Sequence, residues 1–398
     1  MDQESGESPV DQDSRHGRPE RDDRHNRADR GSGDQRGERD PGIRLRAAGR
    51  SDEAALAAAR ADRLGRRFLS AAATSNRYSY AIVAEGAGGP VGAVELDHLL
   101  PDLGSGQARF WVGPQARRRG VATAALREVS ELVFAGAPGM PRLQRLELLI
   151  HQDNPVAQRV ALAAGYVREG ERRGALPNPA GGHDDVLVYG RLAGDSGEPV
   201  ERLLPDLPGG ELSDGVVTLR PLGEDDRGFY ATLHSEPDVV ATSVPPVPPS
   251  PEEVRRRCSW AAAHWLAGHR ADLVLVDAAS GAAAGQISLY YQEPRTGQAM
   301  IGYSMLPAFR GRGLVTRAAK LLSLWVFAET GIARLIAGTL PDNVGSQRVL
   351  EKAGFRREAY LRSRLPGVAG TRHDDVQFVL FAEDLLRQAS GGELTQPG

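Results

Sequence analysis

Short apolar segments bounded by turn residues recur at matching places in the two halves of the chain. They span residues 81–84, 91–96 and 146–150 in the first half and residues 273–276, 285–291 and 335–339 in the second. Their length and composition are typical of β-strands rather than helices. The hydrophobic pattern therefore predicts a sheet in each half.

Apolar residues spaced by three and four positions predict one longer helix in each half. The apolar face consists of Val121, Ala125, Val129, Leu132 and Val133 in the first and of Leu314, Ala318, Leu322, Trp325 and Val326 in the second. A shorter helix is expected after the third strand of each half. Asn154 and Asn343 are its candidate N-caps, and Gly165 and Gly354 its candidate C-caps. Strands and helices in this order predict a mixed α+β fold.

The two halves also repeat each other in sequence. Arg-Arg-Arg-Gly-Val-Ala-Thr at 117–123 corresponds to Arg-Gly-Arg-Gly-Leu-Val-Thr at 310–316, Asp-Asn followed by Gln-Arg-Val occurs at 153–160 and 342–349, and His-Asp-Asp-Val occurs at 183–186 and 373–376. The offsets are 193, 189 and 190 residues, and a longer Gly/Pro-rich loop at 135–141 of the first copy accounts for the decrease. Near-constant offsets over this distance indicate a duplicated domain.

Composition suggests the boundaries of the two copies. Residues 1–41 carry almost no large apolar side chains, and such a segment cannot bury enough surface to offset the entropy of ordering it. We therefore predict a disordered tail over 1–41, a first domain over 42–192, a Gly- and Pro-rich linker over 193–215, a second domain over 216–388 and a disordered tail over 389–398.

Charge and cysteine content argue against several classes of function. The formal net charge is −3, which is not the basic footprint of a protein that binds nucleic acid or an anionic membrane. Cys258 is the only cysteine, so neither an intramolecular disulfide nor a thiolate metal site is expected. No apolar run approaches the ~18 residues of a membrane span, and the N-terminus does not resemble a signal peptide. We expect a cytoplasmic protein without metal, nucleic-acid or membrane partners.

The segments 117–123 and 310–316 carry the clearest candidate chemistry. Each places glycine among basic residues where a strand leads into a helix. Glycine lets the backbone approach a ligand closely, and the first N–H groups of a helix have no internal partner. With the positive end of the helix dipole and the arginines, these groups form an anion site suited to a pyrophosphate. One such loop could equally be a basic turn, but two in the same context favour the functional interpretation.

The pattern Arg-x-x-Gly-x-Ala before a helix resembles the acyl-CoA signature of the GNAT superfamily of N-acetyltransferases. The later Asn and the Ala-Gly-Tyr or Ala-Gly-Phe turn at 164–166 and 353–355 are also similar. The resemblance covers nearly everything outside the tails and the linker. It implies two tandem domains, each a V-splayed mixed sheet of six or seven strands with flanking helices. The pantetheine arm of acetyl-CoA would lie between the two central strands like an added strand.

The resemblance assigns cofactor contacts in both copies. They are Arg117, Arg118, Gly120, Ala122, Thr123 and Asn154 in the first copy and Met305, Leu306, Arg310, Gly311, Arg312, Gly313, Val315, Thr316 and Asn343 in the second. Val315 departs from the signature, because it stands where Gly or Ala is expected and its bulk would crowd the phosphates.

The second copy is similar to the branch that acetylates ribosomal-protein N-termini and to related small-molecule acetyltransferases. Its opening segment at 217–222, its Pro-rich stretch at 245–251 and a possible capping box of Ser250 and Glu253 match that branch. The first copy lacks the Pro-rich stretch and has Ala157 where the second has Ser346. Its substrate side is therefore expected to differ.

The usual catalytic base has no counterpart, because relatives carry a glutamate where this chain has Gln107 and Met300. Deprotonating an α-amine of pKa ~8 at pH 7 costs ~1.4 kcal/mol, whereas a lysine at ~10.4 costs ~4.6 kcal/mol. A site without a strong base therefore favours an α-amine. We expect direct attack on the thioester, with strand N–H groups near residues 304–306 stabilising the oxyanion.

Tyr303, Ser346 and Asp374 are the candidate catalytic residues. Tyr303 or Ser346 could protonate or orient the leaving thiolate, although Phe110 matches Tyr303 in the first copy and packing is the alternative. Asp374 could act on the substrate side, and hydrogen bonding within its turn is the alternative.

The sequence leaves the acceptor open between a protein N-terminus and a small amine such as an antibiotic or polyamine. It also leaves open whether the first copy is catalytic or a non-catalytic acyl-CoA-binding module. It does not indicate the oligomeric state.

Overall fold

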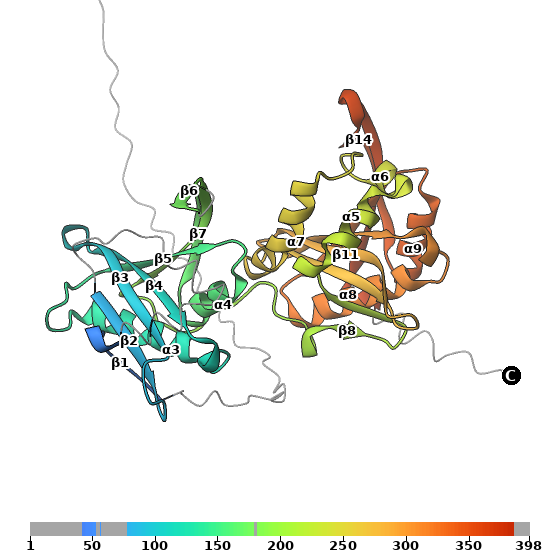
Figure 1. Ribbon diagram of the computed structural model, residues 1–398. Helices are drawn as coiled ribbons and strands as arrows, with labels where there is room; N and C mark the ends of the chain where they lie inside the picture. The colour runs from blue at the N-terminus through green and yellow to red at the C-terminus, as the bar shows by residue number, and fades with distance from the viewer. Residues whose placement is uncertain (1–41, 53–55, 57–77, 179–180, 386–398) are drawn as a thin grey trace, which may run out of the picture. The chain divides into compact units, whose positions relative to one another are not determined.

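The chain forms two mixed sheets, one in each half, each with its own hydrophobic core. The computed structural model describes residues 42–52, 56, 78–178 and 181–385 (Figure 1). Both predicted tails, at 1–41 and 389–398, lie outside these residues. Among the described residues no helix combines the length and the hydrophobicity needed to cross a bilayer.

The first sheet has seven strands in the order β1-β2-β3-β4-β5-β7-β6. They are β1 (Ile43–Ala47), β2 (Tyr78–Ala84), β3 (Gly92–Leu100), β4 (Ser105–Val112), β5 (Arg145–His151), β6 (Val167–Pro177) and β7 (His183–Leu192). Only β4 and β5 pair in parallel. Helix α3 (Val121–Ala135) connects these two strands, and α4 (Pro155–Ala163) follows β5.

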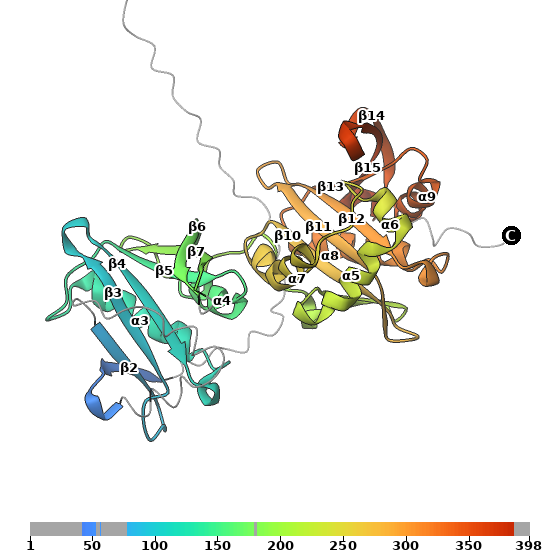
Figure 2. The same cartoon turned by 45° about the horizontal axis from the view of Figure 1, so that its top comes forward.

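The second sheet has eight strands in the order β14-β15-β13-β12-β11-β10-β9-β8, and Figure 2 labels β10 to β13 in this order. The strands are β8 (Leu212–Ser213), β9 (Val217–Pro221), β10 (Arg270–Asp277), β11 (Ala282–Glu293), β12 (Gln298–Met305), β13 (Arg334–Thr339), β14 (Arg356–Pro366) and β15 (Arg372–Phe381). The helices are α5 (Arg227–Ser235), α6 (Pro237–Thr242), α7 (Pro251–Leu266), α8 (Leu314–Glu329) and α9 (Val344–Ala353). The α+β class and the mixed sheets are confirmed. The eighth strand exceeds the expected six or seven because β8 adds a short edge.

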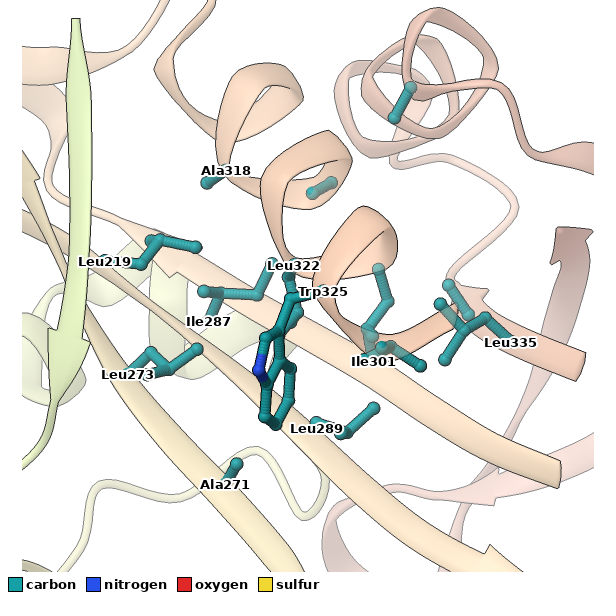
Figure 3. Close-up of a cluster of buried hydrophobic side chains, with 14 of the residues drawn as sticks. Leu219, Ala271, Leu273, Ile287, Leu289, Ile301, Ala318, Leu322, Trp325 and Leu335 are labelled. Atoms are coloured by element: carbon teal, nitrogen blue, oxygen red, sulfur yellow. The ribbon is translucent and has the colours of Figure 1, made fainter. Parts of the chain in front are cut away.

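The helix that follows each glycine motif packs on one face of its sheet, as its apolar spacing predicts. In the second half, Ala318, Leu322 and Trp325 of α8 face apolar residues of the strands (Figure 3). These strand residues are Leu219, Leu273, Ile287, Leu289, Ile301 and Leu335. Because side chains alternate along a strand, this packing fixes which residues face away from α8.

Helices α5 and α7 cover part of the opposite face of the second sheet. Tyr230 and Cys258 pack there against Val274, so Cys258 belongs to a core as expected, and burial raises the pKa of its thiol to about 11. The capping box of α7 is also confirmed. The Glu253 N–H donates to Ser250 Oγ at 3.3 Å, and the Ser250 N–H donates to Glu253 Oε2 at 2.8 Å.

The predicted linker, residues 193–215, is divided between the two folds: Ala193 and Val200 pack against the first core, and the part from Leu204 onwards belongs to the second. Leu204 is fully buried and Leu207 is nearly so in the core under α8, and the Trp265 indole N–H donates to the Pro205 carbonyl at 2.9 Å. Residues 212–213 form β8. The second fold therefore begins before residue 216.

The strand register corrects the sequence match of the two His-Asp-Asp-Val segments. Leu187 pairs with Ile150, and Val376 pairs with Thr339, so the two copies correspond at an offset of 189 residues here rather than 190. The structural counterpart of Asp374 is therefore Asp185, and that of Asp375 is Val186.

We expect Leu204→Ala to destabilise the protein by ~2–5 kcal/mol, because it opens a cavity in a packed core. The neighbouring Leu203 is 47% exposed, so Leu203→Ala is the matched control and should change the free energy of unfolding by less than ~0.5 kcal/mol. Chemical denaturation of the full chain measures both. Equal, small effects would show that the segment is only a connection.

Candidate functional site

The two parallel central strands of each sheet are paired over only a short stretch. Strand β12 pairs with β13 from Gln298 to Met300, although it continues to Met305. In the first sheet β4 pairs with β5 from Ser105 to Gln107 and continues to Val112. The strands therefore part in both sheets, as the V-splayed fold implies. We call the region between the parted strands β12 and β13 the gap.

The backbone of β12 presents hydrogen-bonding groups to this gap. The Leu306 N–H donates to the Ala284 carbonyl of β11 at 3.0 Å, and Gln286 pairs with Ser304. Because the direction of N–H groups alternates along a strand, those of Tyr303 and Met305 point to the opposite edge, towards the gap. Of the predicted donors at 304–306, only Met305 thus faces the gap, and the Leu306 N–H is already bonded.

The glycine motifs form the turns that lead into α3 and α8. Gly120 has φ +73° and Gly313 has φ +75°, and neither helix has a side-chain N-cap bond. The first N–H groups of both helices thus lack a side-chain partner from the N-cap residue. The position of Gly311, φ +74°, is occupied in the first copy by Arg118, which keeps the same left-handed conformation at φ +57°.

The first arginine of each motif ties its turn to the preceding strand. Arg117 Nε donates to the Val112 carbonyl at 2.9 Å, and Arg310 Nε donates to the Met305 carbonyl at 3.2 Å. In the second copy two carboxylates also hold the arginines: Arg310 Nη1 lies 2.7 Å from Asp238, and Arg312 Nη2 lies 3.0 Å from Asp277. An anion at this turn would compete with these carboxylates for the same guanidinium groups.

The small-residue position of the signature faces the protein interior in both copies. Ala122 and Val315 are half-buried and pack against the hydrophobic cores under α3 and α8. Part of the Val315 side chain therefore contributes to the core, and the crowding of phosphates expected from the sequence stays a prediction. Thr123 and Thr316 are half-buried at the next position of each helix.

Three of the predicted residues form a hydrogen-bonded chain between β12 and α9. The Tyr303 hydroxyl lies 2.8 Å from Ser346 Oγ, and Asn343 Oδ1 accepts the Ser346 N–H at 3.0 Å. Burial raises the pKa of Tyr303 to about 12. Asn343 and its counterpart Asn154 are thus confirmed as N-caps, and Asn343 also orients Ser346.

Asp374 is tied into the β14–β15 hairpin instead. It accepts the Tyr360 hydroxyl at 2.6 Å and the N–H of Ser363 at 2.7 Å, and these bonds lower its pKa. Asp185 accepts the Gly174 N–H at 2.7 Å in the same way. Turn hydrogen bonding, the alternative to a catalytic role, thus accounts for Asp374.

A family model now bears on this arrangement. The model of the acetyltransferase (GNAT) domain matches the chain twice, at residues 43–167 and 217–356, which together exceed half of its length. The chain belongs to the GNAT acetyltransferase family. Both matches include a glycine turn and the parted strands.

Curated relatives match parts of the chain. The Bacillus subtilis (strain 168) protein named "Probable N-acetyltransferase YjcK" is 43% identical over 67 residues, which are 17% of this chain and 37% of that protein. YdaF of the same organism, whose name marks it as a candidate ribosomal N-acetyltransferase, is 32% identical over 104 residues, 26% of this chain and 56% of that protein. The chain spans less than two thirds of either relative.

Solved structures are similar to single halves of the chain. Mycobacterium smegmatis RimJ, in complex with CoA-disulfide, is 23% identical with a TM-score of 0.39 and covers 46% of this chain and 93% of its own. The ribosomal-protein-S5-alanine acetyltransferase of Vibrio fischeri is 19% identical with a TM-score of 0.40 and covers 44% and 98%.

The second GNAT domain carries a buried polar network that the sequence reasoning missed. Asp272 of β10 is 1% exposed and accepts bonds from Arg257 at 2.7 Å, Arg270 at 2.8 Å and Ser288 Oγ at 2.7 Å. Because Ser288 donates its only proton to Asp272, it must accept from the Gln286 amide nitrogen at 3.1 Å. The sequence signal that could have predicted this network is the alternation of polar with apolar residues on the central strands, as at Gln286 and Ser288.

This network fixes the tautomer of His234 on α5. The Gln286 nitrogen faces Ser288, so its oxygen faces His234 Nε2 at 2.7 Å, and that nitrogen must carry the proton. Burial lowers the pKa of His234, opposed mainly by the bond to Gln286. In the neutral form of His234, Nδ1 is therefore the ring nitrogen left as an acceptor.

The parted strands β4 and β5 of the first domain correspond to β12 and β13. On the sheet face that points away from α3 and α8, the two domains differ beside these strands. Gly302 of β12 corresponds to Arg109 of β4, which forms an ion pair with Asp97 and lies 3.9 Å from Glu95. An arginine with two carboxylates thus occupies a place that glycine leaves open in the second domain.

Proposed function

We propose that the second domain transfers an acetyl group from acetyl-CoA to a primary amine, with a protein or peptide α-amine as the favoured acceptor. The observation that carries this proposal is the combination of a glycine turn opening α8 with strands that part beside it. A pyrophosphate suits the first feature, and an extended amide chain suits the second.

The proposed binding mode uses the backbone N–H groups that face the gap and those at the start of α8. The pyrophosphate would lie on the first N–H groups of α8, where the helix dipole favours negative charge. The pantetheine amides would bond to the N–H groups of Tyr303 and Met305 that face the gap. Asp238 and Asp277 would release Arg310 and Arg312 to the phosphates. The residues of the first turn, from Arg117 to Thr123, would serve the first domain in the same way.

The chemical step is direct attack of the amine nitrogen on the thioester carbonyl, with the Met305 or Tyr303 N–H stabilising the oxyanion. A phenol of pKa about 12 cannot fully protonate a thiolate of pKa ~8.5, because the transfer is uphill by ~4.8 kcal/mol. Tyr303 therefore acts by donating a hydrogen bond to the departing sulfur, and Ser346 holds its hydroxyl in place.

The preference for an α-amine follows from the acceptors themselves. At pH 7 a lysine costs ~3.2 kcal/mol more to deprotonate than an α-amine, whichever group takes the proton. The name of YdaF, a candidate ribosomal N-acetyltransferase, supports the same class. Small amines of low pKa are the second class of acceptor.

For the first domain we propose acyl-CoA binding without transfer. It retains the turn and the parted strands, but it has Phe110 and Ala157 in place of the hydroxyl pair of Tyr303 and Ser346. Arg109 and its carboxylates fill the face from which an amine would approach.

The deciding experiment is a screen of the full chain with acetyl-CoA, measured as thiol release. We compare a lysine-free peptide with a free N-terminus, an Nα-blocked peptide with one lysine, and small amines. We expect the free N-terminus to be acetylated ~200-fold faster than lysine at pH 7, the factor that corresponds to ~3.2 kcal/mol. Acetyl-CoA binding without thiol release from any acceptor would contradict the function.

Gly313→Glu should abolish CoA binding by the second domain. It places a carboxylate against the phosphates and a bulky residue at φ +75°. A Cβ at Gly313 meets nothing within 4 Å, so Gly313→Asn, which tolerates this conformation, is the control and should retain binding. Calorimetry should show two sites per chain in the wild type and one in Gly313→Glu; an unchanged count would refute the assignment.

Tyr303→Phe should lower kcat by ~10–100-fold, because it removes the hydrogen bond to the leaving sulfur while keeping the ring. The KM for acetyl-CoA should change less than ~2-fold. Because the pKa of Tyr303 is about 12, its ionisation should cause no loss of activity up to pH 10. Steady-state kinetics with the best acceptor test this, and an unaltered kcat would remove Tyr303 from the mechanism.

A further inference from the structure

On the face opposite α8, each of the two strands that border the gap carries a glycine, Gly302 on β12 and Gly338 on β13. We call these two positions the lips of the gap. Gly302 lies on β12 just after the last residue paired with β13, and a Cβ built there would meet only the edge of the Tyr290 ring, at 4.0 Å. Gly338 lies on β13, also beyond the paired stretch, and is exposed although its strand neighbours are buried. Neither glycine therefore places a side chain of its own at the gap.

One carboxylate reaches the β13 lip. Asp375 of β15 is 3% exposed, and its Oδ1 lies 2.6 Å from the position of a Cβ on Gly338. Its Oδ2 contacts Arg364 Nε at 3.2 Å, whereas Oδ1 has no hydrogen-bond partner among the described residues. A buried acceptor left without a partner costs ~1–3 kcal/mol, so it calls for an explanation.

The fold does not require this carboxylate. In the first domain Val186 stands in place of Asp375, Leu149 in place of Gly338 and Arg109 in place of Gly302. The same strands form there with the same register. The carboxylate and the two glycines therefore serve something other than the architecture.

We propose that Asp375 receives the acceptor amine of the second domain, with Oδ1 accepting an N–H of the acceptor and taking its proton. This inference rests on the proposed acetyl transfer. Asp375 would thus be the base that is missing at Met300. It comes from β15 rather than β12, and it reaches the lip formed by β13.

The proton steps balance. An acceptor enters as an ammonium ion and meets the Asp375 carboxylate in a site of low dielectric constant, where a neutral pair is favoured over two buried charges. The ammonium proton moves to Oδ1 and leaves a free amine. Its lone pair forms the C–N bond as the C–S bond breaks, the second amine proton goes to the thiolate, and Asp375 returns its proton to water.

The surroundings of Asp375 agree with this role. Burial raises the pKa of Asp375 above its ordinary value, and this makes the carboxylate a better proton acceptor. Arg364 on β14 is the charged group that faces it and, with the nearby Thr339 N–H on β13, opposes this rise in pKa, but neither forms a hydrogen bond with Oδ1. His234 on α5, bonded to Gln286 across from Ser304, is the competing base near the other lip.

The test uses Asp375→Asn, which keeps the shape but cannot take a proton. With a free-N-terminus peptide at pH 7 we expect kcat/KM to fall ~100-fold while the Kd for acetyl-CoA stays within ~2-fold. The loss should shrink as the pH rises above ~8, where the amine is neutral without help. An O-alkylhydroxylamine, already neutral at pH 7, should lose less than ~3-fold. A purely structural role would not depend on the ionisation of the acceptor.

Three variants complete the design. Asp375→Val introduces the residue that the first domain has, and should fold at least as stably as the wild type while losing acetylation, because a buried charge disappears. Asp225→Asn changes an exposed carboxylate in the turn before α5 and should leave kcat/KM within ~3-fold. His234→Gln tests the competing base.

The outcomes separate the inference from the proposed function. If the wild type acetylates the peptide and Asp375→Asn and Asp375→Val keep kcat/KM within ~3-fold at pH 7, the inference is overturned and the function stands. The inference also falls if His234→Gln alone shows the ammonium-dependent loss. If the wild type binds acetyl-CoA but acetylates nothing, both fall.

Discussion

The central feature of the second domain is that its two parallel strands, β12 and β13, are hydrogen-bonded at one end only. Strand β12 is paired with β13 only as far as Met300, yet both strands continue, so the N–H and C=O groups on their facing edges are left without the ladder that a sheet normally provides. Backbone groups in such a place need another partner. An extended chain with amides can supply one, and in the proposed function the glycine turn after β12 would hold the anionic group with which such a chain begins. Both proposals, for the cofactor and for the acceptor, therefore depend on the parting of these two strands.

Comparison of the two domains separates what the fold needs from what the chemistry needs. Both keep the arginine bonded to the end of the central strand, the asparagine N-cap and the aspartate that holds the hairpin turn. They differ at the lips of the gap and at the hydroxyl pair of Tyr303 and Ser346. These particular differences lie where the proposed function places the acceptor and the departing thiolate, so we relate them to reactivity rather than to folding.

Much of this could be predicted from the sequence. The helices α3 and α8, with their buried faces, follow from the spacing of apolar residues, and the repeat with its glycine turns identified the family. The eighth strand escaped prediction because Leu212 and Ser213 are too few to show a period. The match of the two His-Asp-Asp-Val segments was wrong by one residue. Their identical sequences align at an offset of 190 residues, whereas the strand pairing, which only the structure reveals, aligns the two domains at an offset of 189.

The candidate site was harder to predict, because its chemistry lies on strands that are distant in sequence. Asp375 follows Asp374, and without the register nothing distinguishes a hairpin carboxylate from a buried one. Alternation within β15 places Asp375 opposite the core residues Val376 and Phe378, but the lip it reaches belongs to β13. Side-chain networks such as that of Asp272 and Gln286 likewise join α5, β10 and β11, and no local pattern encodes such contacts.

The backbone of the first domain argues that its turn has kept a purpose. Arg118 adopts φ +57° where the second domain has Gly311, and a residue with a Cβ is destabilised there by ~1–2 kcal/mol. A turn without function could relax into an ordinary conformation, whereas a turn that must direct N–H groups at a ligand cannot. The strained turn stands beside a gap whose acceptor face is occupied by Arg109 and its carboxylates. The retained turn, together with Arg109 and its carboxylates at the opposite face, agrees with the proposal that the first domain holds an acyl-CoA and leaves the transfer to the second.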